Sequence, residues 1–309
     1  MTAEIKAYSP TSRRPGFWAA VRRYRWPYLF IAPFFVLFCV FGVYPIAFSV
    51  WLGFQDWNGA PGRQLWVGLE NYTTLFRDEY FWNSMLNTVF IFLLHFPVMT
   101  FGALVLAVIL NQNFLRNQGL WRALIFLPHL TSMVAAGFTF RLIFERDSGI
   151  ANGLLESIGL GRVPWLDDVW WARIAVSILL IWAWTGYQMV LYLAALQAIP
   201  GELVEAAMVD GASRIQVFWR ITVPLLRPVT VFIFTMSIIG TFALYTEPTI
   251  LTGGGPIRAT TTPTMEIYGA AFGNLRYGYA AALSYVYFAI VVFATIIQLR
   301  LTGNKGDVA

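Results

Sequence analysis

Six long stretches of this chain carry no charged residue, and they constrain its fold more than any other feature. A helix that crosses the hydrocarbon core of a bilayer needs about 20 mostly apolar residues. Each stretch can hold one such helix, so the sequence predicts an all-α integral membrane protein with six transmembrane helices. The charges that bracket the six stretches are Arg25 and Asp56, Glu79 and Arg116, Arg122 and Arg141, Arg173 and Glu202, Arg227 and Glu247, and Arg276 and Arg300.

The composition agrees with this interpretation, because 58% of the residues are hydrophobic and 12% are charged. Soluble domains usually carry about 25% charged residues. The first apolar run is longer than the roughly 7 to 15 residues of a signal-peptide core, so we expect it to be retained. The expected segments are a tail over 1–25, a transmembrane domain over 26–301 with spans at about 27–53, 85–112, 121–143, 172–198, 226–250 and 277–300, and a tail over 302–309.

The basic residues predict the orientation, since Lys and Arg accumulate on the cytoplasmic side of membrane proteins. With the N-terminus inside, the inner segments hold 13 of the 21 basic residues but only 5 of the 16 acidic residues. We therefore expect a multi-pass protein of the cell (inner or cytoplasmic) membrane with both termini in the cytoplasm. The positive net charge reflects this topology and gives no reason to expect a nucleic-acid partner.

Between the fourth and fifth expected spans, residues 200–224 predict a compact cytoplasmic helix-turn-helix. Pro200 ends the preceding span, and residues 202–209 form a short helix with acidic residues near its N-terminus, where the helix dipole favours them. Gly211 supplies the backbone freedom for a tight turn. The Ser-x-x-Gln pattern at 213–216 is a capping-box signature for a second short helix, and we expect the proline at the end of the segment to end that helix.

Enzymatic chemistry is disfavoured by what the sequence lacks. The two lysines, Lys6 and Lys305, lie near the ends of the chain, so no Gly-Lys-Ser/Thr closes a phosphate-binding loop, and there is no G-x-S-x-G. His95 and His129 fall in different spans without a third obvious metal ligand, and we interpret each as a hydrogen-bonded histidine inside the membrane. We expect no catalytic, metal or cofactor site in this chain, with any ATP and magnesium bound by a partner subunit.

The helix-turn-helix carries a spaced pattern. The order Glu205-Ala206-Ala207, Gly211, Ile221, Pro224 resembles the E-A-A-x3-G-x9-I-x-L-P signature of permease subunits in binding-protein-dependent ABC importers, with Val223 in place of the Leu. Further short motifs resemble the carbohydrate-import permeases of the maltose and glycerol-3-phosphate type: Tyr44-Pro45, GLENY at 68–72, Asn87-Thr88, Phe126-Leu127-Pro128, LQ-x-IP at 196–200 and LTGGGP at 251–256.

The resemblance implies that the signature segment docks into a groove on an ATPase subunit. It assigns this coupling role to Glu202, Glu205, Ala206, Ala207, Asp210, Gly211, Ala212, Ile221 and Pro224. It also implies an assembly with a homologous second permease subunit, an ATPase dimer and an extracytoplasmic solute-binding protein. A plain amphipathic connector on the surface of the lipid bilayer is the alternative for this segment.

Candidate contacts with a sugar substrate lie in the fourth and fifth spans. A path for a polyhydroxylated solute needs hydrogen-bonding groups and flat aromatic faces at a depth where unpaired polar groups are costly. Similar permeases of the maltose type line their sugar site from these two spans, although their paired asparagines correspond to Ala243 and Leu244 here. The expected path residues are Trp182, Trp184, Tyr187, Gln188, Thr241, Tyr245 and Glu247.

Other interpretations stay open for these residues and for the whole chain. Each aromatic side chain could pack between helices or anchor at the interface, and Glu247 could cap a helix or lie at the headgroup level. A permease for another solute class, such as glycerol-3-phosphate or an amino acid, would share the coupling signature. A secondary transporter is less favoured, because it would place acidic groups or broken helices near the midplane for ion coupling.

Overall fold

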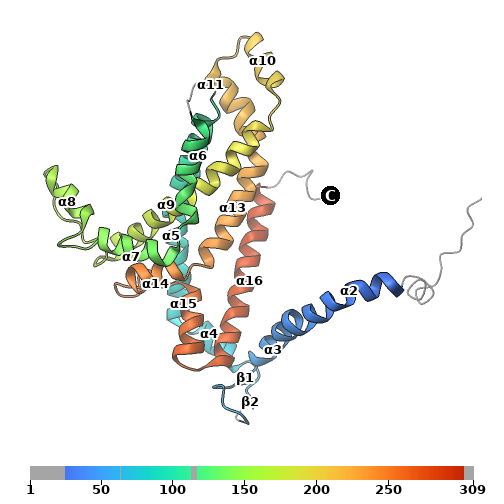
Figure 1. Ribbon diagram of the computed structural model, residues 1–309. Helices are drawn as coiled ribbons and strands as arrows, with labels where there is room; N and C mark the ends of the chain where they lie inside the picture. The colour runs from blue at the N-terminus through green and yellow to red at the C-terminus, as the bar shows by residue number, and fades with distance from the viewer. Residues whose placement is uncertain (1–24, 63, 113–116, 303–309) are drawn as a thin grey trace, which may run out of the picture. The chain divides into compact units, whose positions relative to one another are not determined.

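The computed structural model describes residues 25–62, 64–112 and 117–302. It divides the chain into an N-terminal unit, Met1–Trp51, and a second unit, Leu52–Ala309, which are described separately. Most of the expected N-terminal tail and residues 303–309 lie outside the described residues. The described residues are mostly helical (Figure 1).

The N-terminal unit contains the first predicted span as one helical run. Its parts are α2 (Arg25–Phe38), the π-helical turn η1 (Cys39–Val43) and the start of α3 (Tyr44–Leu52). The backbone N–H of Tyr44 donates to the carbonyl oxygen of Cys39, five residues earlier. Pro45 comes next, and its ring would clash with the carbonyl four residues earlier in a regular α-helix. The wider π-turn lets the helix continue through this proline.

Three unbroken helices of the second unit are long and apolar enough to cross a membrane. They are α5 (Glu79–Leu110), α9 (Val169–Gln197) and α16 (Tyr277–Thr302). Asp78 caps α5 by accepting from the N–H of Tyr80, and Asp168 caps α9 by accepting from the N–H groups of the two following tryptophans. These caps satisfy backbone donors that a helix start leaves without an intrahelical partner.

The remaining two predicted spans are bent. The first pair joins α6 (Gln118–Phe126) and the 3-10 turn η2 (Leu127–Leu130) to α7 (Met133–Ile143) at 92°. The second pair joins residues 214–225 to α13 (Arg227–Phe242) at 58°. Within the described residues there are therefore four long apolar helices, or six spans if each bent pair is counted as one.

The fifth span, predicted over 226–250, ends earlier than expected. Helix α13 ends at Phe242, and Thr246 begins a separate helix, α14 (Thr246–Thr252). The break is stabilised from a distant part of the chain, because Thr262 donates its hydroxyl hydrogen to the carbonyl of Leu244 at 2.6 Å and Thr264 donates to that of Phe242 at 3.2 Å. These carbonyls would otherwise lose their partners where the helix stops.

Hydrogen bonds from Asn87 and Arg173 attach the segment after α14 to two of the long helices, and we call this set of bonds the staple. Asn87 on α5 donates its amide to the carbonyl of Arg258 at 2.7 Å. Arg173 on α9 donates to the side-chain oxygen of Asn87 at 2.7 Å and to the carbonyl of Ala259 at 3.1 Å. The chain then forms α15 (Pro263–Tyr268) and the π-turn η4 (Gly269–Gly273) before α16. The staple holds α14 and its neighbours against α5 and α9.

The shorter elements connect these helices. The strands β1 (Gln55–Asp56) and β2 (Leu65–Trp66) pair antiparallel with Gln55 opposite Trp66, and are followed by α4 (Glu70–Phe76) and, later, α8 (Ile150–Ser157). The core lies mainly along α5 and α9. Gly186 on α9 allows α6 to approach closely, because a Cβ atom there would lie 2.1 Å from the carbonyl oxygen of Ile125.

The predicted helix-turn-helix is present over most of its length. Helix α10 (Gly201–Val209) is followed by Gly211 at a φ of +86°, a conformation that favours glycine. Helix α11 (Arg214–Val217) then begins with the predicted capping box: Ser213 accepts from the N–H of Gln216, whose side chain accepts from the N–H of Ser213. Local sequence was sufficient to identify this motif.

The prediction that Pro224 ends the second helix is wrong. Helix α11 continues through the π-turn η3 (Phe218–Thr222) into α12 (Val223–Leu225). The N–H of Val223 donates to the carbonyl of Phe218, which is the five-residue spacing seen before Pro45 in the first span. The π-turn again accommodates the proline, and the helix bends only after Leu225.

Candidate functional site

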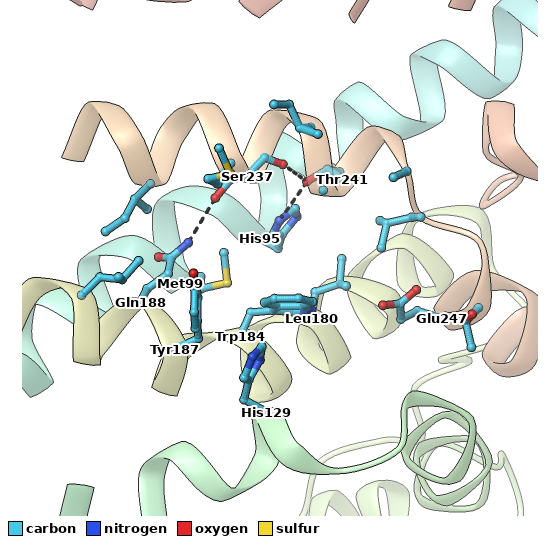
Figure 2. Close-up of a pocket in the computed structure, with 18 of the residues that line it drawn as sticks. His95, Met99, His129, Leu180, Trp184, Tyr187, Gln188, Ser237, Thr241 and Glu247 are labelled. Atoms are coloured by element: carbon cyan, nitrogen blue, oxygen red, sulfur yellow. Dashed lines mark hydrogen bonds between the residues drawn. The ribbon is translucent and has the colours of Figure 1, made fainter. Parts of the chain in front are cut away.

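A cavity of about 660 Å³ lies between the helices of the second unit. Its walls come from α5, α9 and α13, from the turn η2, and from the break between α13 and α14 (Figure 2). Apolar side chains such as Met99, Leu180 and Ile233 form much of the wall. Ligand cavities in proteins commonly measure about 300 to 1,000 Å³, so this one can hold a small solute.

The cavity brings together most of the path residues expected from the sequence. Trp184, Tyr187 and Gln188 line it from α9, Thr241 from α13, and Tyr245 and Glu247 from the break and α14. Trp182 does not line it; its ring packs against that of Phe140 with the centroids 5.3 Å apart. Ala243 and Leu244 also line the cavity.

A hydrogen-bonded polar cluster crosses one side of the cavity. Gln188 donates its amide to the hydroxyl of Ser237 at 3.1 Å and accepts from the hydroxyl of Thr100 at 3.1 Å. Thr241 donates to the carbonyl of Ser237 at 2.7 Å, and its hydroxyl oxygen lies 3.4 Å from Nε2 of His95 (Figure 2). The cluster links α5, α9 and α13 and fixes the positions of four polar residues that line the cavity, namely His95, Gln188, Ser237 and Thr241.

His95 presents a hydrogen-bond acceptor to this cluster. Its Nδ1 lies 2.7 Å from the carbonyl oxygen of Ile91. A carbonyl can only accept, so Nδ1 carries the hydrogen and Nε2 of the neutral ring has a lone pair. The single hydroxyl hydrogen of Thr241 goes to the nearer partner, the carbonyl of Ser237. Nε2 can therefore accept from a hydroxyl group that enters the cavity.

Three aromatic rings form a shelf in the cavity: His129, Trp184 and Tyr187. The His129 ring centroid lies 4.9 Å from that of Tyr187 in a stacked arrangement and 4.7 Å from that of Trp184 at an edge. Among the described residues, the buried Nδ1 of His129 has no hydrogen-bond partner. The interpretation as a hydrogen-bonded histidine therefore fits His95 but not Nδ1 of His129.

No pattern in the sequence indicates that His129 joins this shelf. His129 comes from η2, some 55 residues before the two aromatic residues of α9. The close approach of α6 to α9 at Gly186 places η2 beside Trp184 and Tyr187. No group of three or more His, Cys, Asp or Glu residues suitable for a metal ion occurs within 25–62, 64–112 and 117–302.

Glu247 is the one carboxylate among the residues that line the cavity, all of which belong to the described part of the chain. It lies in the first turn of α14 and is 7% exposed. Its polar contact is with its own backbone amide, and none of the ion pairs among the described residues involves it. Figure 2 places its carboxylate at the end of the cavity away from Gln188.

Helix α10, at the top of Figure 1, is well separated from α14, which contributes Glu247 to the cavity. Helix α10 contains no buried residue, and it carries Glu202, Glu205, Ala206 and Ala207. Apolar side chains nearby are strongly exposed, including Val209 at 87% and Ile215 at 72%. The remaining coupling candidates follow α10 along the chain: Asp210, Gly211 and Ala212 in the turn, Ile221 in η3, and Pro224 in α12.

Known proteins resemble this chain over most of its length. The lactose transport system permease protein of Rhizobium radiobacter is 38% identical over 283 residues, which cover 90% of this chain and 94% of that protein. The arabinooligosaccharides transport system permease protein of Halalkalibacterium halodurans is 35% identical over 285 residues, with 91% and 89% covered. A chain of a bacterial ABC transporter involved in the import of the acidic polysaccharide alginate matches with a TM-score of 0.77 at 26% identity, with 92% of this chain and 99% of that chain covered.

The family described as the binding-protein-dependent transport system inner membrane component matches residues 80–303. That range covers more than half of the chain and includes the cavity and the predicted coupling segment. The chain belongs to this family, and the resemblance recognised in the sequence is confirmed.

Proposed function

We propose that this chain is the permease subunit of an ATP-driven sugar importer and that its cavity forms one half of the translocation path. The observation that carries the proposal is the fixed polar cluster around Gln188, which faces a cavity inside the apolar helical bundle. Buried polar groups are costly unless they are satisfied, and groups that face a cavity can be satisfied by a bound solute.

The chemistry of the cavity suits a saccharide. Gln188, Ser237 and Nε2 of His95 offer hydrogen-bond partners for hydroxyl groups. The shelf of His129, Trp184 and Tyr187 offers flat apolar faces against which the C–H groups of a sugar ring can pack. Relatives whose names refer to lactose and arabino-oligosaccharide transport support the same class of solute.

The segment that begins with α10 is proposed to couple this path to an ATPase. Its exposed side chains combine acidic residues with apolar ones such as Val209 and Ile215, which need cover in an assembled complex. The proposed assembly contains a homologous second permease subunit, an ATPase dimer that binds ATP and magnesium, and an extracytoplasmic solute-binding protein. In this arrangement α10 and both termini lie on the cytoplasmic side.

The experiment is uptake of radiolabelled lactose and arabino-oligosaccharides by cells that express the complete transporter with Gln188→Leu. The change removes a donor and an acceptor from the cavity, so the apparent affinity should fall by about tenfold. Gln298→Leu is the matched control, because Gln298 is an equally buried amide that bonds to Thr235 and Thr302 outside the cavity. Equal apparent affinities in the two variants would contradict the proposed path.

A further inference from the structure

We propose that Glu247 makes this cavity selective for saccharides without negative charge and excludes those that carry a carboxylate, sulfonate or phosphate. The proposal rests on the proposed function, because it takes the cavity to be the sugar path. Family membership does not decide the matter: the related chains include one named for lactose, a neutral sugar, and one described for the acidic polysaccharide alginate.

The cavity wall offers an anionic sugar no permanently charged partner. Among the residues that line it, Glu247 is the one acidic residue, and neither lysine nor arginine is present. An anionic sugar would therefore meet a carboxylate and no permanent cation in this wall. Charges interact more strongly in a partly apolar site than in water, so the unfavourable contact is effective over several ångströms.

The two histidines that line the cavity, His95 and His129, could supply a positive charge if both nitrogens of a ring were protonated. An imidazolium needs acceptors for two N–H groups. Nδ1 of His129 is buried without a partner, and the acceptor that faces Nε2 of His95 is the hydroxyl oxygen of Thr241 at 3.4 Å, which is long for a hydrogen bond. His95 is only 3% exposed and packs edge-on against the ring of Phe92. Their surroundings favour the neutral rings.

Two arginines lie close to the cavity without lining it: Arg173 on α9 and Arg258 in the segment after α14. Arg173 is 8% exposed and is held by Asn87 and by the carbonyl of Ala259, with aromatic rings on its faces. Arg258 forms an ion pair with Glu266 and lies over the ring of Tyr80. Both guanidinium groups thus have partners elsewhere, and neither is available to the carboxyl group of Glu247 or to an anionic group that enters the cavity.

The test measures sugar binding to the purified transporter complex in lipid nanodiscs without its solute-binding protein, so that selection by that protein does not enter. The probes are lactose, and lactose in which the 6-hydroxymethyl group of the galactose is oxidised to a carboxylate, both followed by isothermal titration. We expect the wild-type complex to bind lactose at least about tenfold more tightly than its carboxylate. Glu247→Gln should bring this ratio below about threefold, mainly by strengthening binding of the carboxylate.

Two further variants make the result specific. Glu247→Asp keeps a carboxyl group at this position and should keep the weaker binding of the lactose carboxylate. It is also the variant to measure if Glu247→Gln does not fold. Glu145→Gln removes a half-buried carboxylate that does not line the cavity, so it should leave the ratio unchanged.

The outcomes separate the two proposals. Equal affinities of the wild-type complex for lactose and its carboxylate would overturn the selectivity of Glu247 and leave the sugar path standing. A ratio that persists in Glu247→Gln would also overturn it, because the exclusion would then have another source. If neither lactose, maltose nor an arabino-oligosaccharide binds, the proposed path itself fails, and the selectivity with it.

Discussion

Replacing Gly186 on α9 by alanine should push α6 away from α9 and so move His129 away from the α9 side of the cavity wall. A Cβ atom at this position would lie 2.1 Å from the carbonyl oxygen of Ile125 and 2.9 Å from Cα of Phe126. Ordinary van der Waals contact begins at 3.4 Å, so the backbone of α6 must move away from α9 by about 1.3 Å, the difference between 3.4 Å and 2.1 Å. Both obstructing atoms belong to the backbone and cannot rotate aside.

The magnitude follows from two opposing effects. Overpacking of this kind costs about 1–3 kcal/mol, whereas alanine gains about 1 kcal/mol over glycine inside a helix. The net change should be a destabilisation of up to about 2 kcal/mol. Because α6 continues into η2, the same movement carries His129 away from Trp184 and Tyr187, which it now contacts at centroid distances of 4.7 Å and 4.9 Å.

The assay combines thermal unfolding of the purified protein in detergent with the sugar titration. Gly102→Ala on α5 is the matched control, since a Cβ atom there would meet nothing within 4 Å. The control should be neutral or slightly stabilising and should keep its sugar affinity, whereas Gly186→Ala should unfold at a lower temperature and bind sugar at least about fivefold more weakly. If the two variants behave alike, the close crossing of α6 and α9 is not what positions His129.

Three other perturbations test separate parts of the molecule. Glu205→Lys reverses a charge on exposed α10, in the proposed coupling segment and away from the cavity. It should abolish ATP-driven uptake and leave the affinity for sugar in titrations of the purified complex unchanged. Normal uptake by this variant would refute the proposed coupling role of α10. Arg173→Met leaves the carbonyl oxygen of Ala259 and the side-chain oxygen of Asn87 without the hydrogen bonds that Arg173 donates to them. The protein should lose about 2 kcal/mol or more of stability, measured by thermal unfolding. Equal melting temperatures of the variant and the wild type would show that these bonds do not stabilise the fold. In the loop before α8, hydrogen bonds from Ser148 hold the pKa of Glu145 below its usual value. The resulting stabilisation is present above the usual glutamate pKa and is lost as the pH falls through the lowered value, so hydrogen exchange in this loop should accelerate there and Glu145→Gln should remove that dependence.

The site shows where reasoning from the sequence succeeds and where it stops. Trp184, Tyr187 and Gln188 lie on one face of α9, and Leu180 and Leu191 extend that face at helical spacing into the same cavity. Trp182 lies two residues from Trp184, about 200° around the helix, and so points elsewhere. The spacing alone could have excluded it, whereas no local pattern could have added His129.

The two incorrect expectations, one at the end of the helix-turn-helix and one in the fifth span, have different causes. Pro224 was expected to end a helix because a proline clashes in regular α-helical geometry, but the π-turn before it removes that clash. The break after Phe242 depends on Thr262 and Thr264, about 20 residues further along the chain. This break is what moves Glu247 from the expected end of a span into the cavity wall.

The sequence by itself determined the membrane-spanning stretches, the capping box at Ser213 and Gln216, and the family. These features depend on apolar runs and on residues a few positions apart, which a sequence displays directly. Only the tertiary structure decided which polar groups share a cavity. His95, His129, Gln188 and Glu247 come from four separate elements, and they meet because of helix crossings and hydrogen bonds between segments that are distant in the chain.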